Sequence, residues 1–148
     1  MKANASAYLS EIVAPTIAEF RDDPSSRRRA FLACVATFHC IDYMAHRSQN
    51  LRDQFRKESK DFALVDRVAH AFKHARSGNP NSPRNQPLHA SLVFERPPAR
   101  AGVAQSGLSR VGDSRGGVEI WSEAESDVLR AVTKAAEFLR GKIEVEER

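Results

Sequence analysis

The sequence predicts an α+β fold that is predominantly α: a helical bundle with a small antiparallel sheet of two or three strands and a C-terminal helix. Apolar residues recur at helical spacing through most of residues 1–78, and a second helical pattern closes the chain over 122–142. Between them, residues 88–95 alternate with a period of two, which is typical of a half-buried strand. We therefore expect one domain over 1–148, with the sheet confined to 88–121.

The first half of the chain predicts two long helices. Residues 4–20 carry their apolar side chains on one face, and Pro15 should interrupt or kink that helix. The second helix is expected to have Asp23 as its cap and Pro24 in its first position, and to run to about residue 47. It is apolar on most sides, which indicates a central helix.

A third long helix is expected over residues 59–76, after a shorter one, with Gly78 marking its end. In the strand that follows, the two expected faces are Leu88, Ala90, Leu92 and Phe94 against His89, Ser91, Val93 and Glu95. The last helix should begin at a capping box formed by Ser122 and Glu125.

Composition and charge limit the classes of function. With 41% hydrophobic and 28% charged residues, and no apolar run near the ~20 residues of a membrane helix, we expect a cytoplasmic protein with no membrane partner. The net charge of +4 is uneven: residues 47–76 carry a net +4, whereas 122–148 carry a net −2. A basic segment attracts phosphates, so RNA is an expected partner. The arginines at 27–29 lie where a helix dipole disfavours cations, so we expect them to contact an acidic neighbour or a partner.

Polar residues recur on two of the expected helices. At 100° per residue, Arg67, His70 and His74 lie within about 60° of one another, beside the apolar stripe of their helix. On the central helix, His39 and Asp42 lie in a similar stripe, together with Tyr43 and His46. If these helices pack antiparallel, four histidines converge. The alternatives are a core histidine at 39 that bonds to a carbonyl or to Asp42, and a solvated basic face around His74.

Arg67 and His74, with six residues between them, resemble the R-x(4–6)-H signature of the HEPN superfamily. "LVDRVAHAFKH" also resembles the "AFKH" core of small, uncharacterised bacterial proteins that carry an earlier helix with the pattern a-x-x-H-x-x-D, here "TFHCIDYMAH", so that the resemblance covers residues 28–76. The resemblance to the HEPN superfamily implies a helical bundle and, in many members, a metal-independent endoribonuclease of toxin–antitoxin or defence systems. It implies RNA as substrate, a homodimer whose subunits together complete the site, and a cognate antitoxin, with no cofactor.

The resemblance also implies roles for individual residues. His74 would be the general base or acid, Arg67 would bind the phosphate, and His70 would support the catalysis. The residues expected to contact the substrate are Lys73, Arg76, His39 and Asp42. On this hypothesis, a His74→Ala variant folds but no longer cleaves RNA.

Two other hypotheses remain open. His70 and His74 have the i, i+4 spacing that helical zinc sites use, and His39, Asp42 or His46 could complete a tetrahedron. Alternatively, the bundle is a non-catalytic module that binds a nucleotide, RNA or a protein, and its histidines serve structure. Elemental analysis tests the first hypothesis, and mutation of His74 separates the second from the ribonuclease.

Overall fold

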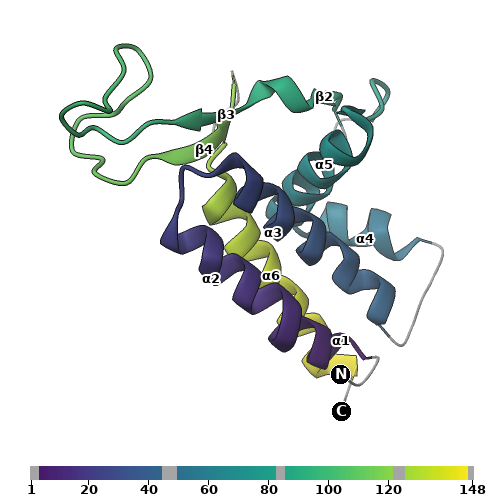
Figure 1. Cartoon of the computed structure of the whole chain (residues 1–148). Coiled ribbons are helices and arrows are strands. Elements are labelled where there is room, and N and C mark those ends of the chain that lie inside the picture. Colours follow the sequence, from purple (N-terminus) through teal and green to yellow (C-terminus); the bar gives the residue numbers. More distant parts are fainter. Residues whose placement is uncertain (1–3, 45–49, 83–85, 122–125, 147–148) are drawn as a thin grey trace.

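The computed structural model describes residues 4–44, 50–82, 86–121 and 126–146. Its long helices pack side by side as a bundle, and two short antiparallel sheets lie at one end of it (Figure 1). The predicted fold class, α+β with a predominance of helix, is confirmed. One continuous hydrophobic core joins the helices, and its largest fully buried side chains include Phe20, Phe55, Phe62, Leu88 and Leu139.

The first helix has three segments: α1 (Ala5–Tyr8), a π-helical turn (Leu9–Val13) and α2 (Ala14–Asp22). Asn4 caps it, because its Oδ1 accepts a hydrogen bond of 2.8 Å from the backbone N–H three residues later. Pro15 lacks an N–H and its ring crowds the carbonyl one turn earlier, which explains why the turn just before it is wider than an α-helix. The predicted first helix is therefore confirmed, with a π-helical turn before the proline.

The central helix, α3 (Arg27–His39), packs against α2, α5 (Lys60–His74) and α6 (Val128–Glu146). The prediction that it begins at Asp23 is wrong: Ser26 is its cap, and the Ser26 Oγ accepts the third N–H of the helix at 3.3 Å. The carbonyl of Asp23 instead accepts the Ser26 N–H at 3.1 Å, which closes a turn before the helix.

Of the arginines that open α3, Arg29 contacts an acidic side chain through its guanidinium, as expected, whereas the Arg27 guanidinium lies 3.4 Å from the carbonyl oxygen of Val93. The backbone N–H of Arg27 donates to the Glu95 carboxylate at 2.9 Å, so a negative charge lies at the positive end of the helix. The Arg29 guanidinium lies 3.9 Å from the carboxylate of Asp23.

The predicted extension of α3 to residue 47 is also wrong. After His39 the chain makes a 3₁₀ turn (Cys40–Tyr43), and Met44 is extended. The side chains of Ile41 and Met44 nevertheless pack against the core, so the apolar pattern continues after the α-helical backbone has ended. Residues 45–49 lie outside the described part of the chain.

α4 (Leu51–Glu58) and α5 meet at Ser59, which ends one helix and caps the next by accepting the Phe62 N–H at 3.0 Å. α5 ends at His74 and not at residue 76 as predicted, because Ala75, with a left-handed φ of 59°, caps it. Gly78 has a different use: its φ is +100°, and a Cβ there would lie 2.5 Å from the carbonyl oxygen of Gln86. Only glycine allows that close approach.

The sheet region contains two separate pairs of strands. β1 (Arg76–Ser77) pairs with β2 (Leu88–His89), and β3 (Val93–Arg96) pairs with β4 (Gly117–Ile120). The prediction of one alternating strand over 88–95 is wrong, because a 3₁₀ turn (Ala90–Leu92) separates β2 from β3. That turn changes the register.

The change of register exchanges the expected faces. Val93, which the alternation assigned to the polar face, is fully buried, whereas Leu92 is 39% exposed. The segment between β3 and β4, residues 97–116, projects from the bundle as an arm (Figure 1).

α6 begins later and ends later than the predicted 122–142. Asp127 caps it by accepting the Arg130 N–H at 2.7 Å, and the helix extends to Glu146. The predicted capping box at Ser122 and Glu125 lies outside the described residues. In the described part of the chain, none of the helices combines the length and the apolarity that a bilayer span requires.

Candidate functional site

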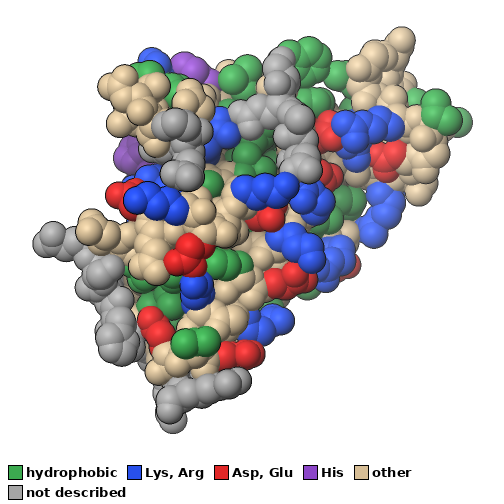
Figure 2. All heavy atoms as spheres, turned by 180° about the vertical axis from the view of Figure 1, so that it is seen from behind, with side chains coloured by type: hydrophobic (Ala, Val, Ile, Leu, Met, Phe, Trp, Pro, Cys, Tyr) green, Lys and Arg blue, Asp and Glu red, His purple; other side chains and the backbone are tan. Residues whose placement is uncertain are grey.

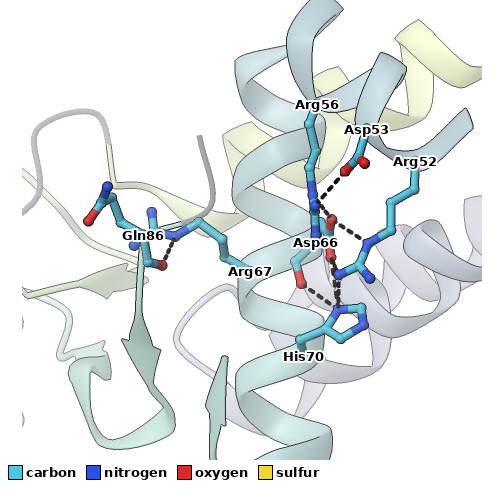
Figure 3. Close-up of polar contacts among 7 residues, drawn as sticks. All are labelled: Arg52, Asp53, Arg56, Asp66, Arg67, His70 and Gln86. Atoms are coloured by element: carbon cyan, nitrogen blue, oxygen red, sulfur yellow. Dashed lines mark hydrogen bonds and ion pairs between the residues drawn. The ribbon is translucent and has the colours of Figure 1, made fainter. Parts of the chain in front are cut away.

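A buried carboxylate lies at the junction of α4 and α5. Asp66, in the middle of α5, has no exposed surface. Two arginines one turn apart on α4 supply the pairing that a buried charge needs (Figure 3). Arg52 donates through Nε at 2.9 Å and through Nη2 at 2.7 Å, and Arg56 donates through Nε to the same carboxylate.

The two arginines differ in their access to solvent. The side chain of Arg52 is 37% exposed, whereas that of Arg56 is 11% exposed and also donates to Asp53 at 2.9 Å. Among the described residues, nothing bonds to the buried Nη2 of Arg56. Arg56 therefore serves mainly to hold α4 on α5, while Arg52 borders the solvent.

His70 lies one turn after Asp66 and completes the cluster. Its Nδ1 is 2.8 Å from Oδ1 of Asp66 and 2.9 Å from the backbone carbonyl oxygen of Asp66. Both of these atoms are acceptors, so Nδ1 carries a proton and donates it. Nη2 of Arg52 lies 3.3 Å from the same nitrogen; since both atoms then carry hydrogens, this contact places the guanidinium beside the ring without bonding to it.

The environment of Asp66 keeps it ionised. Burial opposes ionisation and would raise its pKa, but hydrogen bonds from His70, Arg52 and Arg56 outweigh burial and hold that pKa well below its usual range. A fixed carboxylate on Nδ1 sets the tautomer and the orientation of the imidazole. Among the described residues, none bonds to Nε2 of His70, so this nitrogen can exchange a proton with a substrate.

The side chain of Phe38, on α3, forms the floor beside this cluster. The His70 ring meets it edge to face with 4.7 Å between centroids, and the Arg52 guanidinium lies 5.2 Å from the ring centroid. The ring of His74, which is exposed, lies 6.2 Å from that of His70. The structure therefore brings Arg52, His70 and His74 together around one edge of α5.

Arg67 does not join this group. Its Nε donates to the carbonyl oxygen of Gln86 at 2.9 Å, and Figure 3 shows its side chain pointing away from His70, toward the segment before β2. The Cα atoms of Arg67 and His70 are close on the helix wheel, as predicted. The long arginine side chain nevertheless turns to the other side of the helix, because a carbonyl acceptor is present there.

His39 and Asp42 bond to each other, with 2.7 Å between Nδ1 and Oδ2, as one of the two hypotheses for His39 required. The pair lies at the surface rather than in the core, with side chains 40% and 50% exposed. The His39 ring contacts Phe38, the residue that also contacts His70. His46, the fourth histidine of the expected cluster, lies outside the described residues.

The remaining residues expected to contact the substrate are exposed at the end of α5. Lys73 lies in the last turn of that helix, and Arg76 pairs through its backbone with His89 across β1 and β2. Their role in binding stays a prediction.

A metal site formed by these histidines is not assembled in residues 4–44, 50–82, 86–121 and 126–146, where no three His, Cys, Asp or Glu side chains are grouped as metal ligands. The Nδ1 of His70 is bonded to Asp66, and His39 is bonded to Asp42.

The sequence interpretation missed Asp66, Arg52 and Arg56. Two signals were present: Asp66 and His70 are four residues apart, and so are the two arginines. Neither signal says which way a side chain faces. An aspartate beside an apolar stripe is usually solvated, and only the packing of α4 over α5 makes this one buried.

Comparison with known proteins finds no family model, no curated protein and no solved structure that matches this chain.

Proposed function

We propose that the chain is a HEPN-like, metal-independent endoribonuclease whose acid–base residue is His70, positioned by Asp66, with Arg52 as the phosphate ligand. The contact of 2.8 Å between Nδ1 of His70 and the buried, ionised carboxylate of Asp66 carries this proposal. It modifies the roles that the R-x(6)-H resemblance implies: His70 takes the acid–base role of His74, and Arg52 takes the phosphate-binding role of Arg67.

The chemistry uses Nε2 of His70 and Nη1 of Arg52, because Nε and Nη2 of Arg52 already donate to Asp66. Nε2 of His70 removes the proton from a 2′-hydroxyl, and the resulting 2′-oxygen attacks the adjacent phosphorus. The guanidinium of Arg52 stabilises the charge that develops on the phosphorane oxygens. His74, protonated, gives a proton to the leaving 5′-oxygen, so that the products are a 2′,3′-cyclic phosphate and a 5′-hydroxyl.

The distribution of charge supports a polyanionic substrate at this end of α5. The basic excess of the chain lies in residues 47–76, which include α4 and α5. On the face opposite to that of Figure 1, Lys and Arg side chains are interspersed with Asp and Glu, and the histidines lie at its corner (Figure 2). The net +4 of residues 47–76 and the histidines of α5 therefore belong to the same part of the chain.

The test is cleavage of a panel of single-stranded RNAs by His70→Ala. We expect the rate to fall by about 10²- to 10⁴-fold, because a positioned acid–base group contributes that much. His89→Ala is the matched control, because His89 is exposed on β2 and outside the cluster, and it should cleave at the wild-type rate. RNA with a single 2′-deoxy position at the scissile bond should resist cleavage there.

Two results would contradict the proposal. One is a wild-type protein that cleaves none of the RNAs in the panel. The other is a His70→Ala variant that is folded and cleaves as fast as the wild type. If only His74→Ala abolishes cleavage, the general base is His74, as the resemblance implies.

A second candidate, a non-catalytic binding module, is favoured by the burial of the same cluster. Asp66 is fully buried and Arg56 is 11% exposed, so the ion pairs also fasten α4 to α5. In that case His70→Ala changes stability and leaves any weak RNA binding unchanged.

The expected partners belong to this proposal. A homodimer would place two α5 edges around one RNA, and a cognate antitoxin would cover them. Light scattering of the purified chain tests the dimer: a mass of 16.5 kDa at all concentrations would rule it out.

A further inference from the structure

The β3–β4 ribbon has one face toward the core, and its other, outer face is buried at Arg96 and Glu119 and reaches solvent at Leu92 and Trp121. Val93, Val118 and Ile120 are buried on the inner face. On the outer face, Phe94 and Trp121 meet with ring centroids 5.3 Å apart and planes at 69°. Trp121 is 54% exposed and Leu92 beside it is 39% exposed, so this outer face carries large apolar side chains in contact with solvent.

Guanidinium groups lie on the same face as the aromatic rings. Arg96 is two residues from Phe94 along β3, and Glu119 is opposite Phe94 in the register, so all three share that face. The Glu119 carboxylate accepts from Nη1 of Arg96 and from Nη2 of Arg110, both at 2.6 Å. Arg110, from the arm, is 63% exposed and pairs with Glu119, the residue opposite Phe94 in the register.

The arm itself is basic. Over residues 97–116 it carries Arg100, Arg110 and Arg115 against one carboxylate, Asp113. Arg100 is exposed and has no side-chain partner among the described residues. A segment of this length without helix or strand, inside a compact chain, is usually functional.

The arm and the ribbon are held in one conformation. The Asp113 carboxylate accepts N–H groups of the arm from Gly116 at 2.9 Å and Arg115 at 3.2 Å, and it accepts Nε of Arg96 at 2.8 Å. Arg115 in turn donates to carbonyls at the end of α2. The aromatic face is therefore presented on a fixed support, which lowers the entropic cost of binding.

We propose that this outer face, formed by Leu92, Phe94, Trp121 and the arginines of the arm, binds single-stranded RNA. An unpaired base stacks on Trp121, and arginines of the arm contact the phosphates. Exposed aromatic rings beside guanidinium groups are the combination that binds single strands without reading their sequence. This inference rests on the proposed function for the choice of polymer. The Ala90 N–H bonds to the Ala75 carbonyl at 3.0 Å, which ties the chain entering β3 to the end of the helix that carries His70 and His74.

The test uses the intrinsic fluorescence of Trp121, because the chain contains one tryptophan. The probe is a 2′-O-methyl oligouridylate, which lacks the 2′-hydroxyl and cannot be cleaved through it. We expect saturable quenching by this oligomer and little quenching by an RNA duplex of equal length, because paired bases are not free to stack.

Variants assign the binding to this face. By anisotropy of a labelled oligomer, Trp121→Ala should weaken binding by about 5- to 150-fold, the range for loss of one base stack. Trp121→Phe should keep most of the affinity, because phenylalanine also offers a π face. Val111→Ser, at the most exposed apolar residue of the arm, is the matched control and should bind as the wild type does. Arg100→Gln should weaken binding and lower the salt dependence by about one counterion.

Three results would overturn the inference: no quenching by the oligomer, equal affinity of Trp121→Ala and the wild type, or equal loss in Trp121→Phe and Trp121→Ala. If the wild type is a dimer that Trp121→Ala dissociates, and RNA does not quench it, the face binds a second copy of the chain instead. Because the probe cannot be cleaved, this test is independent of catalysis. Quenching without cleavage of natural RNA would refute the proposed ribonuclease and leave the binding face standing.

Discussion

At the junction of α4 and α5 a buried carboxylate, Asp66, is surrounded by cationic side chains, whereas in the β3–β4 ribbon a buried guanidinium, Arg96, is surrounded by carboxylates. The first cluster joins α4 to α5, and the second joins β3 to the arm and to β4. The side chain of Asp66 has no exposed surface and that of Arg96 is 8% exposed, so both central charges depend on their partners.

The clusters differ in what their partners can do. Asp66 is bonded to Nδ1 of His70, and none of the described residues bonds to Nε2 of the same ring. Arg96 is bonded to Glu119 and Asp113, and Arg110 also pairs with Glu119. Only the first cluster therefore presents an imidazole nitrogen for proton transfer, whereas the second ties the arm to the ribbon.

Replacing Asp66 by Asn should have the largest effect on stability. The change removes the carboxylate that Arg52, Arg56 and His70 share, and it leaves the mostly buried Arg56 only the exposed Asp53. Breaking a buried ion pair from one side costs about 3–5 kcal/mol. Urea unfolding followed by circular dichroism measures the free energy of unfolding. Asp53→Asn is the matched control on α4: its side chain is 63% exposed, so we expect a loss below about 1 kcal/mol. Equal losses in the two variants would show that the buried carboxylate is not the centre of the cluster.

Replacing Arg96 by Met should cost less, about 2 kcal/mol, because both of its partners keep other bonds. Glu119 retains Arg110, and Asp113 retains the N–H groups of the arm. The same urea titration measures it. At saturating RNA the cleavage rate should equal that of the wild type, which separates this cluster from that of Asp66, whereas the affinity for RNA should fall because Arg96 holds the arm. A loss of cleavage in folded Arg96→Met would mean that the ribbon takes part in the reaction.

The two clusters should differ least in how the free energy of unfolding depends on pH. The folded-state pKa of Asp66 lies below its unfolded value, because its hydrogen bonds to His70, Arg52 and Arg56 outweigh burial. The unfolded chain therefore takes up a proton first as the pH falls. The stabilisation from Asp66 is complete above pH about 4 and is lost progressively below it.

Asp113 provides the comparison for that titration. Burial opposes its ionisation, but the N–H groups of Gly116 and Arg115, together with Arg96, lower its pKa in the same direction. Its side chain is 22% exposed, so solvent screens these contacts more than those of Asp66. The acid decline of the unfolding free energy, measured from pH 5 downward, should flatten strongly in Asp66→Asn and slightly in Asp113→Asn. An unchanged decline in Asp66→Asn would contradict the assignment.

The elements that depend on local pattern could be predicted from the sequence. Helical periodicity predicted the helices, including the stripe of α5 with Val65 and Val68, both of which are fully buried. Their ends were less certain, because apolar residues continue past α3 into a 3₁₀ turn. The prediction of a single strand over 88–95 was wrong for a related reason. The short 3₁₀ turn within it keeps the local pattern of apolar residues but reverses which of the following residues face inward.

The sequence by itself determined the fold class, the basic segment and the helix that carries His70 and His74, because each depends on composition or on spacing along one element. Only the tertiary structure decided which of those side chains work together. It buried Asp66 under Arg52 and Arg56, turned Arg67 toward Gln86, and left Trp121 in solvent. The physical reason is that burial and pairing arise between elements, and a helix wheel gives the direction of a Cβ but not the neighbour that its side chain meets.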